Sequence, residues 1–150
     1  MSDTILCLIP CSSDGKFDRH ALECLTTAQQ LKTALSANLV VGTWGAAVPD
    51  TSIGSIGASA YLQVEGAAFN QARYATDSAA AEAIVKQCGA TVILAPANSR
   101  IQRIIAGVAQ RMGGTVDTHA TGVEAENGRI VVSRWYYRQR MLAKLVRSAR

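Results

Sequence analysis

The stretch from Thr91 to Gly113 constrains the fold of this chain most strongly, because it combines a strand, a short loop and a helix. Residues 91–95 form a continuous apolar run, which is typical of a strand covered on both faces of a sheet. Pro96 cannot donate a hydrogen bond to a neighbouring strand, so the strand should end there. Ser99 and Gln102 have the spacing of a capping box at the start of an amphipathic helix. A buried strand that leads directly into such a helix is the building unit of an α/β fold.

The loop within this stretch is the first place to look for a ligand, because ligands bind beyond the carboxyl ends of the strands in open α/β sheets. A second loop of this kind follows an apolar strand at Thr4–Pro10. A helix N-terminus can bind an anion, and a thiol beside one can be reactive. Helix capping and a spectator cysteine explain the same residues without a ligand. The candidates at this cleft are Cys11, Ser12, Asn98, Ser99 and Arg100.

The remaining periodicity predicts alternating strands and helices. We expect strands at 39–44, 61–64, 115–124 and 128–133, helices at 18–37 and from Thr76 or Asp77 to Cys88, and helical turns near 51–57 and 67–73. Asp18 is the expected N-cap of the first helix, and Asn127-Gly128 is a strong hairpin signal. We therefore predict a single domain, 1–150, with an α/β fold. It is a three-layer, adenine-nucleotide-hydrolase-like sandwich whose Rossmann-like, mostly parallel sheet carries antiparallel C-terminal edge strands.

Several classes of site are not indicated by the sequence. The four cysteines form no C-x-x-C pair, and neither His20 nor His119 stands at metal-ligand spacing from them, so we expect no metal site. The common glycine-rich phosphate motifs are absent, and we interpret Gly42 and Gly45 as turn residues. We expect no membrane span and no signal peptide, and hence a reduced, cytoplasmic protein. No catalytic constellation is evident.

Charge is unevenly distributed along the chain. Residues 129–150 contain seven Lys and Arg residues and no acid; because the whole chain carries +4, the first 128 residues sum to −3. Such a basic segment can attract nucleic acid, anionic lipid or an acidic partner. We do not expect a nucleic-acid partner, because no nucleic-acid-binding module accompanies the charge.

Aromatic and basic residues adjoin one another within this basic segment. The combination suits a protein interface hot spot or, as an alternative, single-stranded nucleic acid, and we favour the interface. From residue 135 onward, the apolar spacing favours a helix over a strand. The interface candidates are Arg134, Trp135, Tyr136, Tyr137 and Arg138.

The order of elements and four segments resemble the N-terminal domain of the electron transfer flavoprotein alpha subunit. The segments are 22–28, 92–99, 106–113 and 128–134 with Tyr137; the second is similar to the family's apolar strand ending in Pro-Ala-Thr-Ser. The chain departs from the family pattern at three places. Ile101-Gln102-Arg103 replaces Gly-Arg-Asp, His119 stands where an Asp is common, and Gln139-Arg140 replaces Gly-Asn.

The resemblance implies that the chain works as part of a larger complex. In the family, alpha pairs with a beta subunit, and a C-terminal alpha domain, which we expect to be missing here, holds FAD. The chain would then be a scaffold domain of a cytoplasmic heterodimer, an electron-carrier component without catalysis of its own and without FAD when alone. In isolation, its exposed interface could form a homodimer. The resemblance also predicts an edge strand at 142–148, against the periodicity.

A different function stays open at this point. The alternative is a stand-alone AMP- or ATP-binding module of the universal-stress-like superfamily. The nucleotide would then lie between the loops 10–13 and 96–100.

Overall fold

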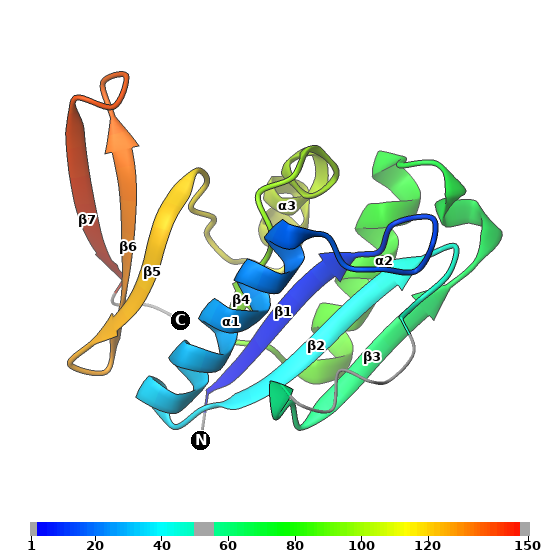
Figure 1. Cartoon of the computed structure of the whole chain (residues 1–150), viewed down its shortest axis with the longest axis horizontal. Coiled ribbons are helices and arrows are strands. Elements are labelled where there is room, and N and C mark those ends of the chain that lie inside the picture. Colours follow the sequence, from blue (N-terminus) through cyan, green and yellow to red (C-terminus); the bar gives the residue numbers. More distant parts are fainter. Residues whose placement is uncertain (1–2, 50–55, 148–150) are drawn as a thin grey trace.

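The computed structural model describes residues 3–49 and 56–147, and within them it contains two β-sheets flanked by helices (Figure 1). The parallel sheet has the strand order β3-β2-β1-β4, and the antiparallel sheet has the order β5-β6-β7. The strands are β1 Thr4–Pro10, β2 Asn38–Gly45, β3 Ala60–Glu65, β4 Val92–Leu94, β5 Ala120–Glu126, β6 Arg129–Tyr136 and β7 Met141–Arg147. The helices are α1 Arg19–Leu35, the 3-10 helix η2 Ala67–Asn70, α2 Tyr74–Cys88 and α3 Ser99–Arg111. The predicted α/β fold is thus confirmed, and its antiparallel C-terminal strands form a sheet of their own.

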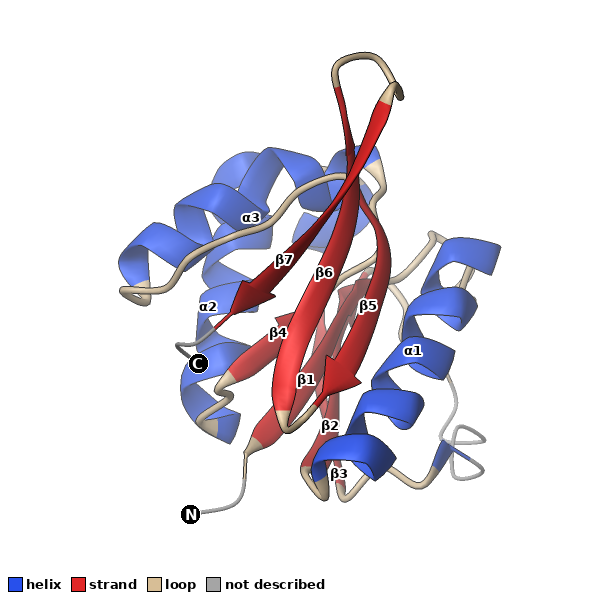
Figure 2. Cartoon of the chain, turned by 90° about the vertical axis from the view of Figure 1, so that its left-hand side faces the viewer, coloured by secondary structure: helices blue, strands red, loops and turns tan. Residues whose placement is uncertain are grey.

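Helices cover both faces of the parallel sheet (Figures 1 and 2). Successive side chains of β1 point to opposite faces, so its continuous apolar run supplies two cores. Ile5 and Ile9 pack against α1, whereas Leu6 and Leu8 pack against α2 and α3. β1 is therefore the buried central strand that its composition predicts. β4, in the run at 91–95, is an edge strand of three residues: Ile93 packs against one core and Val92 and Leu94 against the other, but all three are only half-buried. The predicted coverage of both faces therefore holds only in part.

Close packing of α2 on the sheet explains one glycine that we had interpreted as a turn residue. Gly42 lies inside β2, and a Cβ atom there would come within 2.4 Å of Ile84 Cγ2 on α2. A side chain here would force Ile84, or the helix that carries it, to move. The predicted turn is therefore wrong, and the glycine permits the close approach of α2 to β2.

Helix starts follow the predicted caps only in part. The carboxylate of Asp18 accepts a hydrogen bond from the Ala21 N–H at 2.7 Å, which confirms it as the N-cap of α1. The N-cap of α3 is Asn98, whose Oδ1 accepts from the Ile101 N–H at 2.9 Å, so the capping role assigned to Ser99 is wrong. Asn98 has the extended backbone that an N-cap requires, and Ser99 already belongs to the helix.

The C-terminal sheet contains the predicted hairpin, but the start of β5 and the conformation of the last segment differ from what periodicity predicts. Asn127 and Gly128 both have positive φ angles, 51° and 73°, as expected of a two-residue turn between β5 and β6. β5 begins only at Ala120, five residues later than predicted, and His119 precedes it. β7 pairs along its whole length with β6, which confirms the edge strand and makes the helical interpretation of the segment wrong. Of the predicted helical turns, η2 confirms the one near 67–73, whereas most of 51–57 lies outside the described residues.

Candidate functional site

The predicted cleft lies at the carboxyl end of the parallel sheet, where β1 and β2 end and α3 begins (Figure 1). Cys11 follows β1 directly, and its N–H donates to the Trp44 carbonyl of β2 at 2.8 Å. The backbone at the end of β2 passes so close to Cys11 that a Cβ atom on Gly45 would lie 2.9 Å from the Cβ of Cys11. Cys11 is therefore a buried residue that packs between strand ends and does not line an open cleft.

A buried ion pair occupies the region beside it. The Arg100 guanidinium donates from Nε to Asp77 Oδ2 at 2.7 Å and from Nη2 to Oδ1 at 2.6 Å. Asp77 Oδ1 also accepts from the Trp44 indole N–H at 2.9 Å. The Asp77 side chain is 2% exposed and that of Arg100 is 18% exposed. This forked geometry is the strong form of a charge-assisted hydrogen bond, and it satisfies the buried carboxylate.

The pair joins elements that are far apart in the sequence. Asp77 comes from α2, Trp44 from β2 and Arg100 from α3, and Arg100 Nη2 also donates to the Phe69 carbonyl of η2 at 3.3 Å. These residues therefore act as a clamp across the carboxyl end of the sheet, and we call Trp44, Asp77 and Arg100 the clamp. The charge of Arg100 is already balanced within the clamp, which leaves it poorly suited to bind an anionic ligand.

Sequence reasoning missed two of the three clamp residues. The sequence predicts that this helix begins at Thr76 or Asp77, but α2 begins at Tyr74 and Asp77 is buried in the core. One signal was present: Asp77 lies on the apolar face of α2, at helical spacing from Ala80, Ala81, Ile84 and Val85. A carboxylate in such a row is buried and needs a partner. The identity of that partner depends on tertiary contacts across 23 and 33 residues.

The Cys11 thiol is not activated in this environment. Burial raises its pKa from the ordinary value of 9.0 to about 11, although the neighbouring Thr43 hydroxyl and the positive charge of Arg100 act in the opposite direction. The contact with Thr43 falls short of hydrogen-bond geometry. A reactive cysteine needs a lowered pKa, so Cys11 is a packing residue at neutral pH.

The other cleft candidates do not converge on a common point. Ser12 is exposed in the loop after β1, where its carbonyl accepts from the Gly15 N–H. Asn98 is used as the N-cap of α3, and Ser99 is exposed on the first turn. The described residues thus fit a bound nucleotide poorly at this end of the sheet, because the cation is paired and the thiol is buried. Binding of AMP or ATP stays a prediction, and calorimetry with each nucleotide tests it.

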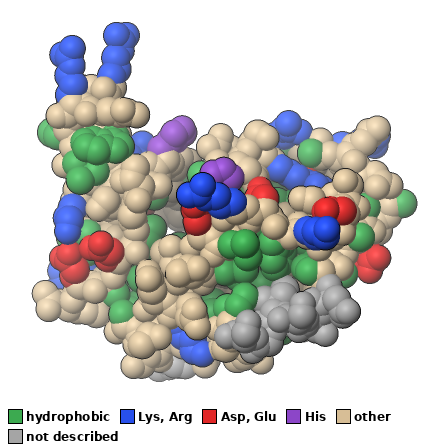
Figure 3. Space-filling view, viewed as in Figure 1, with side chains coloured by type: hydrophobic (Ala, Val, Ile, Leu, Met, Phe, Trp, Pro, Cys, Tyr) green, Lys and Arg blue, Asp and Glu red, His purple; other side chains and the backbone are tan. Residues whose placement is uncertain are grey.

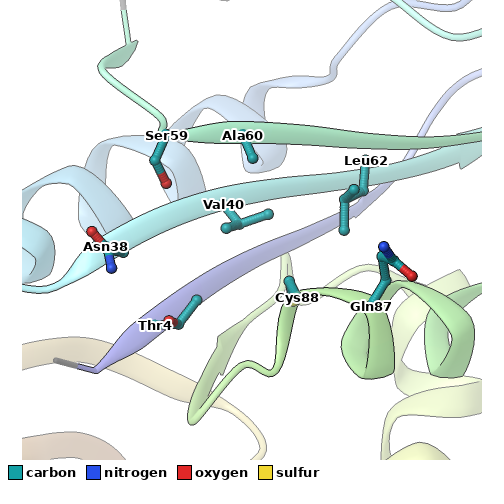
Figure 4. A pocket seen from close by; sticks show the side chains of 8 residues that line it. All are labelled: Thr4, Asn38, Val40, Ser59, Ala60, Leu62, Gln87 and Cys88. Atoms are coloured by element: carbon teal, nitrogen blue, oxygen red, sulfur yellow. The ribbon is translucent and has the colours of Figure 1, made fainter. Parts of the chain in front are cut away.

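A hollow of about 440 Å³ lies at the opposite end of the parallel sheet (Figure 4). Side chains from the first residues of β1, β2 and β3 and from the last turn of α2 surround it. Half of its eight lining residues are polar, with Asn38 and Gln87 as the larger polar groups. It lies at the amino ends of the strands, away from the edge where α/β sheets bind ligands.

The predicted interface residues lie on and beside the β6–β7 hairpin, which extends away from the parallel sheet (Figure 2). Trp135 stands directly opposite Leu142, and the two side chains are 45% and 48% exposed. Val146, on the same face of β7, is 54% exposed. We call Trp135, Leu142 and Val146 the outer face of the hairpin. Lys144 lies between Leu142 and Val146 on this face, so the apolar residues form a patch that contains one cation. Exposed apolar residues grouped on a sheet face are typical of a surface that contacts another protein.

The opposite face of the same sheet is occupied. Val123 and Ala125 of β5 pack against the core under α1. Arg134 and Tyr136 share this side of β6, with the guanidinium 4.9 Å from the ring centre of Tyr136. Tyr137 and Arg138 form the turn after β6 with positive φ angles, and Tyr137 is 74% exposed. The five interface candidates are therefore divided between two faces and the hairpin tip.

The sequence was compared with models of known protein families. The family model for the electron transfer flavoprotein domain matches residues 7–150. The chain belongs to the electron transfer flavoprotein family. No curated protein matches it. The match does not specify which subunit of an electron transfer flavoprotein the chain represents.

Family membership associates the chain with FAD and with a partner subunit. In the part of this electron transfer flavoprotein domain that the structure describes, the cleft residues do not fit the flavin nucleotide, because Arg100 is neutralised by Asp77 and the first turn of α3 is capped by Asn98. No group of metal-ligating side chains occurs among the described residues. None of the helices in those residues has the length and apolarity to cross a membrane.

Proposed function

We propose that this electron transfer flavoprotein domain is the N-terminal scaffold of an alpha-type subunit. It would support FAD-mediated electron transfer together with a beta-type subunit and a C-terminal domain that binds the flavin. Residues 1–150 would form this scaffold as a single domain of a cytoplasmic heterodimer. Support comes from the family match and from the lack of fit between the cleft residues and a nucleotide.

The observation that carries the proposal is the outer face of the hairpin. Trp135, Leu142 and Val146 expose apolar surface on strands that are themselves well paired. The opposite face packs on the core under α1 through Val123 and Ala125 of β5, which favours the outer face as the partner surface. Tryptophan is among the residues that contribute most to protein interfaces. The hairpin would therefore contact the beta-type subunit or the FAD-binding domain.

Matched surface variants test this role. Leu142→Asp places a charge on the outer face, whereas Leu22→Asp places one on α1, where the leucine is 54% exposed. Co-purification with a beta-type subunit should fail for Leu142→Asp and Trp135→Ala and persist for Leu22→Asp. Equal binding by the wild type and both leucine variants would exclude the hairpin as the contact surface.

Whether FAD co-purifies with the isolated chain distinguishes a scaffold role from a cofactor-binding role. The chain alone should purify without FAD, and FAD should appear only when a C-terminal FAD-binding domain and a beta-type subunit are both present. Stoichiometric FAD on the isolated chain would contradict the scaffold assignment. Sedimentation of the isolated chain tests whether the uncovered outer face drives homodimer formation instead.

A further inference from the structure

Two thiols meet in the core between the central strand and α1. Cys7 lies in the middle of β1 and is fully buried, whereas Cys24 lies on α1 and is half-buried. Their Sγ atoms are 3.4 Å apart, within hydrogen-bond distance for sulfur. The two side chains therefore point toward each other from different elements, which the separation of 17 residues in the sequence does not reveal.

The pair is asymmetric in its access to solvent. Cys24 retains some exposure on α1, whereas Cys7 has none. The pKa of the Cys7 thiol is raised well above its ordinary value, first by its hydrogen bond with Cys24 and then by burial. Cys7 is thus kept protonated beside Cys24. This is the arrangement of an accessible thiol backed by a buried second thiol, which can resolve an adduct on the first.

We propose that Cys7 and Cys24 form a site of reversible oxidation, at which a small-molecule disulfide such as oxidised glutathione converts the thiol pair into an intrachain disulfide. Cys24, as the thiolate, attacks one sulfur of the reagent; the S–S bond of the reagent breaks and one glutathione leaves. Cys7 then attacks Cys24 Sγ, the bond between Cys24 and glutathione breaks, and the proton of Cys7 passes to the departing glutathione thiolate. The two protein thiols are oxidised by two electrons, and the reagent is reduced to two thiols.

Formation of the disulfide requires the two sulfur atoms to move closer together. The sulfur atoms must approach from 3.4 Å to about 2 Å, the length of a disulfide bond. The bond would join α1 to the central strand. Val123 and Ala125 of β5 pack on the same core as Cys24. A disulfide would therefore hold α1 in place on the side where it contacts the antiparallel sheet.

Peptide mapping tests the proposal on the intact native chain. Trypsin cuts after Lys16, Arg19 and Lys32, so Cys7 and Cys24 fall in separate peptides, 1–16 and 20–32. Because Cys11 shares the first peptide, the experiment uses Cys11→Ala as background. After treatment with oxidised glutathione and blocking of free thiols, we expect a mass loss of about 2 Da and linkage of the two peptides. Dithiothreitol should reverse both changes.

Three variants identify the thiols that react. Cys24→Ser should abolish the link, and Cys7→Ala should leave a stable glutathione adduct on Cys24. Cys88→Ser removes another half-buried thiol and should leave the link unchanged. The proposal is overturned if the native background chain keeps its thiols free, or if a glutathione adduct persists on Cys24 while Cys7 is present. Circular dichroism tests whether each variant is folded. The result on the Cys11→Ala background does not depend on the other three variants.

Discussion

Substitution of Asp77 should lower the stability of the fold strongly, because its carboxylate is buried and accepts hydrogen bonds from both Arg100 and Trp44. Asp77→Asn keeps the shape of the side chain but leaves the guanidinium without its counter-charge. Removing one partner of a buried ion pair costs about 3–5 kcal/mol. Since the Arg100 side chain retains 18% exposure, we expect a loss near the lower end, about 3 kcal/mol in the free energy of unfolding. Urea denaturation measures it.

The double variant Asp77→Asn/Arg100→Met separates charge from packing. It removes the uncompensated cation and should recover a large part of the loss, because replacing a buried pair by apolar groups is often neutral. As a comparison, Glu82→Gln weakens the pairs of a half-buried carboxylate with Lys86 and Arg111, whose own side chains are exposed, and should cost less than Asp77→Asn. If Asp77→Asn costs no more than Glu82→Gln, the expected contribution of the clamp to stability is contradicted.

The raised pKa of Cys11 predicts that the stability of the fold decreases at alkaline pH. Its pKa is about 11 in the folded chain and near the ordinary value of 9.0 when unfolded. Above pH 9 the unfolded thiol loses its proton while the folded one keeps it, so unfolding becomes more favourable. The stability contributed by the protonated thiol is present below pH 9 and lost as the pH rises toward 11. Cys11→Ala should therefore show a shallower decline in stability than the wild type over this range, measured by urea denaturation at each pH.

At the residue scale, the sequence indicated the end of the sheet at which the candidate residues lie, but it did not indicate their partners. Cys11 and Arg100 lie at the same edge of the sheet, where the charge of Arg100 acts on the Cys11 thiol. Their pairing with Asp77 and Trp44 was not predictable, because the hydrogen bonds depend on how α2 and α3 pack together. Local spacing gives helix faces and caps; it does not give the partner of a buried charge.

At the scale of single elements, the start of α3 distinguishes two neighbouring capping residues. Asn98 accepts the Ile101 N–H, whereas Ser99 is exposed on the first turn. Asn98→Ala should therefore cost about 1 kcal/mol of unfolding free energy, as typical N-cap losses do. Ser99→Ala should be nearly neutral. Thermal or urea denaturation of the two variants side by side measures the difference, and the reverse order would support the capping box inferred from the sequence.

Elements with strong local signals were the predictable ones. β1 was identified by its apolar run, α1 by Asp18 and its stripe, and the β5–β6 hairpin by Asn127-Gly128. β7 was not predictable from periodicity, because its outer residues Leu142 and Val146 are apolar as well as exposed. Exposed apolar residues blur the alternation that marks a half-buried strand. The resemblance to a known family corrected the interpretation there.

At the scale of the whole molecule, positive charge gathers on the C-terminal sheet and its hairpin tip. Some of these charges are matched locally: Lys144 pairs with Glu126, and Arg147 with Asp117. Lys and Arg side chains extend from the tip of the β6–β7 hairpin in the space-filling view (Figure 3), where Arg138 and Arg140 are exposed. The tip thus carries unmatched charge, as far as the described residues show, next to the apolar outer face.

This arrangement predicts how the proposed partner associates. Exposed charges at the rim of an interface mainly raise the rate of association, whereas apolar contacts at its centre mainly slow dissociation. Arg138→Ala/Arg140→Ala should therefore slow binding to a beta-type subunit and weaken its salt dependence, with little change in the dissociation rate. Trp135→Ala should do the opposite and speed dissociation. Stopped-flow binding at several salt concentrations measures both rates. A double arginine variant that changes only the dissociation rate would place the tip inside the contact, and an unchanged association rate at low salt would contradict electrostatic steering.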